Sequence, residues 1–256
     1  MAQTLLLIAE GPTDHRTVTT LADRVVSKAI SGSTVDEPGL MDPRLAALRE
    51  WGGIVPETPF TAWRDIKELA ARNNIRVLGG QKERGLDRDK FRKALLLAEK
   101  LRKGGSRWMV VSRDLHTDHP DDRRSSLEEV RDEYQGKGWT IVLALAQPFR
   151  EAWVLNGFRP MNSDESKTLA AERSKLGFDP THFPEKLDAQ LSTAKKNGKR
   201  VLEVLCCCSG DSREREDQCL EQCDLDHLHK SGKGSGLSKF LLDVESILVP
   251  RLLAEG

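Results

Sequence analysis

Three acidic side chains of this 256-residue chain stand just beyond apolar runs that have the length of buried strands. These residues are Glu10, Asp114 and Glu151. In an open α/β sheet the carboxyl ends of the strands share one edge, so residues that are distant in the sequence converge there. Asp14 and Asp118 each follow one of these acids by four residues and could join the same group.

Carboxylates gathered at one place repel one another by about 4 kcal/mol per close pair at an effective dielectric constant near 20. Shared protons can offset this repulsion, and a divalent cation does so better. Oxygen ligands of this kind suit Mg²⁺ or Mn²⁺, which can also hold water and phosphate. The pattern therefore predicts a metal site for phosphoryl-transfer chemistry, with His116 as a further ligand or base.

The elements that must position these residues follow from the apolar pattern. Apolar runs predict buried strands at residues 3–9, 106–112 and 139–145. A helix is expected to begin at Pro12, with Gly11 as its N-cap. Further elements are expected as helices at about 61–73, 85–102, 123–135, from 150 or 151, and in two C-terminal pieces separated at 231–236, with a short strand at 75–78. Strands alternating with helices indicate an α/β fold whose sheet is mostly parallel and carries helices on both faces.

Two polar segments, residues 31–60 and 157–198, interrupt this alternation and are rich in glycine and proline. One short helix near residues 43–51 is expected within the first of them. Structureless loops of this length are rare in a compact domain, so we interpret both segments as insertions. The chain then forms a single elaborated domain over residues 1–256.

The composition limits the class of protein. Lys plus Arg and Asp plus Glu both number 40, so the formal net charge is zero, which excludes a nucleic-acid binder held by bulk charge. The longest apolar runs are far shorter than the roughly 20 residues that span a bilayer, and no basic region precedes the first of them. We therefore expect no membrane segment and no signal peptide. Five cysteines, three of them consecutive, indicate reduced thiols and a cytoplasmic location.

Some further patterns admit two interpretations. The cysteines and histidines between residues 206 and 229 have helical spacing rather than the short paired spacing of zinc sites, so we interpret them as core or surface residues. Residues 232–239 lack the order of a phosphate-binding P-loop, but Lys239 could contact a scissile phosphate. The most basic patch is either a solvated linker or a contact for a nucleic-acid backbone, and it consists of Lys195, Lys196, Lys199 and Arg200.

Four segments together resemble a known family. The run LLLIAEGPTD at residues 5–14 resembles the first motif of TOPRIM domains, in which an apolar strand ends in Glu-Gly before a helix. Residues 108–114, WMVVSRD, resemble the strand that carries the Asp-x-Asp motif of these domains. Residues 146–155 and 236–240 are similar to the Glu-x-Trp element and the C-terminal segment of a bacterial TOPRIM-like family. The resemblance covers most of the chain outside the two insertions.

The resemblance implies a TOPRIM-like, Rossmann-like fold related to the OLD-type nucleases. Glu10 would then be a metal ligand or general acid/base, and Asp114 the main Mg²⁺ ligand. Relatives are often encoded beside an ATPase and are linked to defence against phage or plasmids. The chain departs from the family pattern at the second Asp of Asp-x-Asp, which is His116 here. Either Asp118 takes over that coordination, or one metal is weakened or lost.

The sequence thus favours a Mg²⁺- or Mn²⁺-dependent nuclease that cleaves nucleic-acid phosphodiesters, with DNA as the expected substrate and an ATPase subunit as the expected partner. The proposed metal ligands are Glu10, Asp14, Asp114, Asp118, His116 and Glu151, and the proposed catalytic residues are Glu10, Asp114 and Lys239. One alternative is a catalytically degenerate TOPRIM subunit that binds or regulates. Another is a phosphoesterase that acts on nucleotides or small phosphates. Assembly into a homo-oligomer is left open.

Overall fold

The computed structural model describes residues 2–32, 42–77, 86–102, 105–117, 119–207 and 211–255. Its strands are β1 (Gln3–Ala9), β2 (Arg49–Gly52), β3 (Thr61–Ala62), β4 (Trp108–Asp114) and β5 (Thr140–Ala146). The helices before β5 are α1 (Pro12–Ser31), α2 (Leu45–Leu48), η1 (Trp63–Asp65), α3 (Ile66–Arg72), α4 (Leu86–Leu101) and α5 (Pro120–Gln135). Those after β5 are α6 (Arg150–Gly157), α7 (Ser163–Leu176), η2 (Pro184–Lys186), α8 (Gly198–Cys206), α9 (Ser212–Glu221), α10 (Leu225–Ser231), α11 (Leu237–Asp243), η4 (Val244–Leu248) and α12 (Val249–Glu255).

The sheet contains five strands, and every strand pair in it is parallel. The main order is β2-β1-β4-β5, with β3 also paired to β1. β2 pairs with the first half of β1 and β3 with its last two residues, so these two short strands share one edge position. β1 and β4 are therefore central neighbours, and their carboxyl ends lie side by side.

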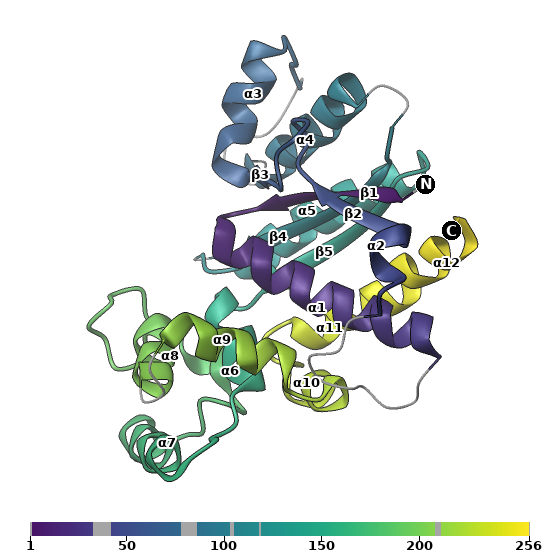
Figure 1. The fold of residues 1–256 in the computed structure, drawn as a ribbon. Coiled ribbons are helices and arrows are strands. Elements are labelled where there is room, and N and C mark those ends of the chain that lie inside the picture. Colours follow the sequence, from purple (N-terminus) through teal and green to yellow (C-terminus); the bar gives the residue numbers. More distant parts are fainter. Residues whose placement is uncertain are drawn as a thin grey trace.

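Each central strand alternates its side chains between two apolar cores. Leu5 and Leu7 of β1 belong to the core that includes α1, α6 and α11, whereas Leu6 and Ile8 belong to the core that includes α3, α4 and α5. Figure 1 shows α3 and α4 on one side of the sheet and α1 and α11 on the other. The predicted α/β fold, with a mainly parallel sheet and helices on both faces, is confirmed at this level.

The start of α1 follows the sequence signal closely. Gly11 is an extended N-cap residue and Pro12 occupies the first turn, as predicted. Proline suits this position because its fixed φ fits a helix and its missing N–H would have no partner there. The chain consequently reverses directly after β1, which places the beginning of α1 beside the end of the strand.

The first expected insertion, residues 31–60, contains an unpredicted strand. The described part of this segment forms α2, then β2, and residues 33–41 lie outside the described residues. The helix expected at 61–73 begins later, because β3 and η1 precede α3. The strand expected at 75–78 is wrong for residues 75–77, which have no regular structure, and residue 78 is not described.

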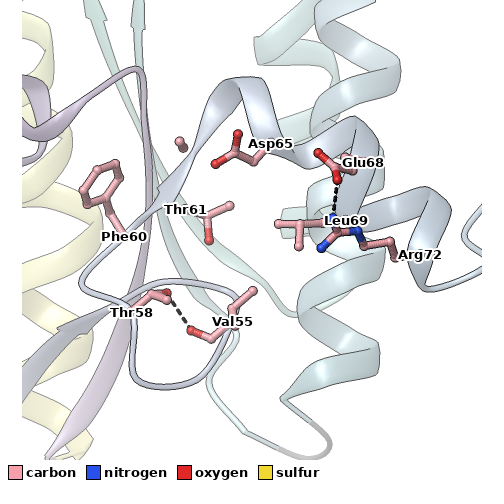
Figure 2. A pocket seen from close by; sticks show the side chains of 9 residues that line it. Val55, Thr58, Phe60, Thr61, Asp65, Glu68, Leu69 and Arg72 are labelled. Carbon is pink, nitrogen blue, oxygen red and sulfur yellow. Dashed lines mark hydrogen bonds and ion pairs between the residues drawn. The ribbon is translucent and has the colours of Figure 1, made fainter.

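The loop between β2 and β3 borders a cavity of about 310 Å³ against α3. Figure 2 shows Asp65, Glu68 and Arg72 at this cavity, with Arg72 turned toward Glu68. Arg72 is the only cation among the described residues that line the cavity, and it forms an ion pair with Glu68. The cavity therefore offers an anion no unpaired positive charge, and it contains none of the predicted site residues.

The second expected insertion, residues 157–198, is more ordered than its composition indicates, because it contains α7 and η2. α7 is mostly polar and is held by ion pairs as well as by apolar contacts. Arg215 of α9 pairs with Glu165 of α7 at 2.8 Å, and both side chains are buried. Figure 1 shows α7, α8 and α9 grouped together next to α6 and away from α3 and α4.

The C-terminal helices begin at a close contact with the sheet. Gly236 has a φ of +83° and precedes α11, and a Cβ atom there would lie 2.3 Å from the carbonyl oxygen of Leu145. Only glycine fits both the left-handed backbone and this approach. The predicted break at 231–236 is thus confirmed, and α11, η4 and α12 follow it without interruption.

Three of the four described cysteines lie in the apolar core: Cys206, Cys219 and Cys223. This agrees with the interpretation of these thiols as core residues.

No helix in the described ranges has the length and apolar character needed to cross a membrane.

Candidate functional site

Asp114, the last residue of β4, lies at the centre of the predicted acidic group. Its Oδ1 accepts a hydrogen bond from the backbone N–H of Arg150 at the start of α6, at 2.9 Å. Its own backbone N–H donates to Oε1 of Glu10 at 3.1 Å. These two bonds join the ends of β1 and β4 to the first turn of α6, so the predicted convergence of Glu10 and Asp114 is present in the fold.

Asp14 and Glu151 occupy the first turns of α1 and α6 and are both buried. Acidic side chains favour this end of a helix because the unpaired N–H groups carry partial positive charge. Both act electrostatically on Asp114, which places four carboxylates from three parts of the chain in one neighbourhood. Asp118, the fifth predicted acid, lies outside the described residues.

Burial and the repulsion between these carboxylates raise the pKa of two of them, Asp14 and Asp114. Burial raises the pKa of Asp114 to about 8, and the negative charges of Glu10, Asp14 and Glu151 contribute to the same shift. Burial, followed by the charge of Glu10, also raises the pKa of Asp14. Asp114 is therefore mostly protonated at neutral pH unless a cation approaches, and a cation would favour its ionised form.

Arg113 balances part of this charge from the opposite face of β4. It forms ion pairs with Glu10 and, at 3.5 Å, with Asp87 of α4. Its guanidinium lies 4.8 Å from the centre of the Trp63 ring, a cation–π contact. Arg113 thus restrains Glu10 from one side, while the backbone of Asp114 binds the same oxygen.

Arg123 of α5 completes this basic side. Its Nε pairs with Asp87 at 2.6 Å, and one terminal nitrogen donates to the carbonyl oxygen of Asp114 at 2.9 Å. Burial lowers the pKa of Arg123. The carbonyl contact places its guanidinium directly against the end of β4.

Arg150 is the structural link between the site and the helical group beyond it. Its buried guanidinium donates to Oγ1 of Thr17 at 3.2 Å and pairs with Glu216 at 2.7 Å. It also lies 3.7 Å from Glu151. Since Thr17 belongs to α1 and Glu216 to α9, this one side chain helps to fix the positions of α1, α6 and α9 relative to one another.

A cleft of about 430 Å³ opens over these residues. Its lining residues combine acids, cations, aromatic rings and amides: Glu10, Arg113, Asp114, His116, Arg123, Phe149, Gln190, Asn197 and Lys199. Asn197 also caps α8 by accepting the backbone N–H of Arg200 at 3.0 Å, and it donates to the carbonyl oxygens of Ala189 and Gln190. The 157–198 segment therefore supplies one wall of the predicted site.

His116 lines the cleft with its ring nitrogens already engaged. Nε2 lies 3.2 Å from the carbonyl oxygen of Asp188, and Nδ1 lies 3.5 Å from the amide nitrogen of Gln190. These partners fit a neutral ring that donates from Nε2 and accepts at Nδ1. In this arrangement both ring nitrogens are hydrogen-bonded to the protein, so His116 could bind a metal ion only if its ring moved. Its role as a ligand stays a prediction.

The predicted basic residues divide into two groups. Lys199 lines the cleft, whereas Lys195 and Lys196 are exposed residues outside its lining. Arg200 binds Glu172 of α7 through two nitrogens, at 3.1 and 2.6 Å, which gives it a structural role between α7 and α8. Lys239 pairs with Asp243 at 3.1 Å and is absent from the described lining of the cleft.

The site also contains residues that the sequence pattern did not single out: Arg113, Arg123, Arg150 and Asp87. Arg113 and Arg150 are each adjacent in sequence to a predicted acid, which is the only local signal of their role. Arg123 and Asp87 come from helices whose packing decides their position, so their sequence positions carry no such signal.

The donor set fits a hard divalent cation in chemical type, because it consists of carboxylate oxygens whose mutual repulsion a cation would relieve. The described hydrogen bonds use Oε1 of Glu10 and Oδ1 of Asp114, and the second oxygen of each group takes part in none of them. In the described part of the chain no three His, Cys, Asp or Glu side chains are placed as a ready-made ligand set. The carboxylates would have to turn toward a common ion.

Comparison with protein-family models, curated proteins and solved structures finds no match to this chain. The interpretation of the site therefore rests on its own geometry.

Proposed function

We propose that this chain is a Mg²⁺- or Mn²⁺-dependent nuclease of TOPRIM type, which hydrolyses nucleic-acid phosphodiesters. The observation that carries the proposal is the convergence of three carboxylates around Asp114, whose pKa is raised to about 8, beside a cleft lined by cations. Such a cluster is costly unless it binds protons or a cation. The parallel sheet with Glu10 after β1 and Asp114 at the end of β4 supports the TOPRIM assignment.

Glu10 and Asp114 would hold the ion, assisted by Asp14, Glu151 and Asp118. When bound, the ion would supply charge stabilisation and an activated water. Arg113 restrains Glu10 through its ion pair, so this carboxylate keeps one oxygen fixed and one directed elsewhere. Glu10 is thereby placed to accept a proton from an attacking water.

The cations of the cleft would bind the substrate backbone. Lys199 lines the cleft, and Arg123 is anchored to Asp87 and to the carbonyl oxygen of Asp114. Two or three cations provide a modest contribution to DNA affinity, because each phosphate contact contributes only part of the salt-dependent binding. This small number, together with the zero net charge, supports dependence on a partner, which we propose to be an ATPase subunit of an antiphage or antiplasmid system.

Cleavage assays test the proposal. Plasmid DNA, single-stranded DNA and RNA are incubated with the protein, alone and with a candidate ATPase, in Mg²⁺, Mn²⁺ or EDTA. We expect metal-dependent cleavage that falls at least about 100-fold in Asp114→Asn and Glu10→Gln. Asp132→Asn, which changes an exposed acid outside the cleft, is the matched control. Cleavage that persists in EDTA, or that is equal in all variants, contradicts the proposal.

A second candidate function is a binding or regulatory subunit that has lost catalysis. The observation that favours it is His116, which stands at the position of the second Asp of the motif and has both ring nitrogens engaged. A folded protein that binds the ATPase partner but neither binds Mg²⁺ nor cleaves any substrate would support this function.

A further inference from the structure

One wall of the cleft carries a stacked aromatic pair. The rings of His116 and Phe149 have centroids 4.2 Å apart and planes inclined by 21°. Both residues are half-buried and line the cleft. His116 comes just after β4 and Phe149 just before α6, so the pair stands at the same sheet edge as Asp114.

Two polar groups flank this pair within the same cleft. The amide nitrogen of Gln190 lies 3.5 Å from Nδ1 of His116, and a carboxamide offers both donors and an acceptor. Lys199, in the first turn of α8, is exposed and takes part in no ion pair with the described residues. Its charge is therefore available to an anion, in contrast to Arg113 and Arg123, which are paired with Asp87.

We propose that this wall is a nucleobase subsite that accepts one unpaired nucleotide, with the base against the His116–Phe149 pair and its phosphate near Lys199. The inference rests on the proposed nuclease function and adds a substrate class to it: single-stranded ends or unpaired nucleotides, in preference to the interior of a duplex. Bases in a duplex have both faces stacked on their neighbours, so they present no face to such a wall.

The chemistry of the cleft matches a nucleotide in three respects. Aromatic side chains bind bases by stacking, which contributes about 1–3 kcal/mol per base and depends little on sequence. The Gln190 amide can pair with the edge of a base. The volume of about 430 Å³ lies within the range of sites that enclose small ligands.

The test measures nucleotide binding in EDTA, where no cleavage takes place. Three probes separate the contributions: deoxyadenosine 5′-monophosphate, deoxyadenosine, and deoxyribose 5-phosphate. Their affinities are measured by calorimetry or ligand-observed NMR at pH 7. We expect the nucleotide to bind at least about 10-fold more tightly than deoxyribose 5-phosphate, which corresponds to about 1.4 kcal/mol for the base.

Variants assign each contribution to a residue. Phe149→Leu and His116→Asn should each reduce the 10-fold preference to less than about threefold. Lys199→Gln should weaken binding of the nucleotide about three- to tenfold and leave deoxyadenosine unchanged. Lys196→Gln, which removes a nearby exposed lysine outside the cleft lining, should change none of the three affinities. If Phe149→Leu proves unfolded by circular dichroism, His116→Asn alone carries the test of stacking.

Equal binding of the nucleotide and of deoxyribose 5-phosphate, or no binding of the nucleotide up to 10 mM, overturns the inference. An unchanged preference in a folded His116→Asn variant overturns it as well. These outcomes would not contradict the proposed function, because metal-dependent cleavage that is lost in Asp114→Asn would still support a nuclease without a base subsite. Nucleotide binding without any cleavage would support the subsite alone.

Discussion

Replacement of Asp114 by asparagine tests the electrostatic account of the site. The pKa of Asp114 is raised from 3.8 to about 8 by burial and by the carboxylates around it. The folded state therefore retains a proton that the unfolded state loses between these two values. The corresponding stabilisation is complete below about pH 4 and is lost as the pH rises toward 8. An asparagine at this position has no titrating proton, so the free energy of unfolding of the variant should not follow that decline.

The size of the effect follows from the shift. Each pKa unit corresponds to about 1.4 kcal/mol, so a shift of about four units sets an upper bound near 6 kcal/mol. Water reaches the cleft and screens its charges, so we expect a smaller difference of about 1–3 kcal/mol. The asparagine side chain can still accept the N–H of Arg150, because that bond needs only an acceptor oxygen.

The assay is urea denaturation of both proteins in EDTA at pH 5, 6, 7 and 8. We expect Asp114→Asn to gain stability relative to the unsubstituted protein by about 1–3 kcal/mol between pH 5 and pH 8. Asp132→Asn, at an exposed acid that pairs with Arg131, should show no such trend. A difference that is independent of pH, or that has the opposite sign, would refute the reasoning.

Other substitutions test the fold and the remaining contacts. Arg215→Met should lower the free energy of unfolding in urea by about 3–5 kcal/mol, because it removes the guanidinium that pairs with the buried carboxylate of Glu165. Gly236→Ala should lower the thermal midpoint and reduce the free energy of unfolding by about 1–3 kcal/mol. The reason is that φ is +83° at this position and that the new methyl group would meet the carbonyl oxygen of Leu145. An unchanged midpoint would contradict this prediction. His116→Asn should leave stabilisation by Mg²⁺ unchanged in thermal shift assays, because both ring nitrogens are already engaged; loss of that stabilisation would restore His116 as a ligand.

The sequence predicts the central sheet well, for a physical reason. β1, β4 and β5 are covered by helices on both faces, so they are continuous apolar runs such as Leu5–Ala9. The sequence of β2, Arg49–Gly52, contains two charged residues and no apolar run, since this strand is only partly buried at the edge of the sheet. Its pairing with β1 depends on tertiary contacts, which an apolar pattern does not contain.

α7 shows a different reason for a missed element. Asn162 caps its start through two N–H groups, and Gly177 ends it in the left-handed conformation, so both boundary signals are present in the sequence. The helix lacks a wide apolar stripe, because Glu165 and Glu172 are buried through ion pairs with arginines of α9 and α8. A search for apolar periodicity therefore does not find it.

The candidate site likewise contains some residues whose positions the sequence predicts and others whose positions depend on tertiary packing. Glu10 and Asp114 can be predicted to converge, because strands in a parallel sheet end at one edge. The ion pairs of Arg113 and Arg123 with Asp87 depend on where α4 and α5 pack, which the sequence alone does not give. The contact of Lys239 with Asp243 is different, because the two residues are four positions apart on α11 and pair through local helix geometry.

The most direct test of the central claim is calorimetric titration of Mg²⁺ and Mn²⁺ into the metal-free protein, the Asp114→Asn variant and the Glu10→Gln variant. We expect one saturable site in the micromolar-to-millimolar range, with proton release at pH 7 as Asp114 ionises. The Asp114→Asn variant should lose this binding, and the Glu10→Gln variant should bind the ion more weakly. Absence of binding to the folded protein, or equal binding by all three proteins, would contradict a metal site built on these carboxylates.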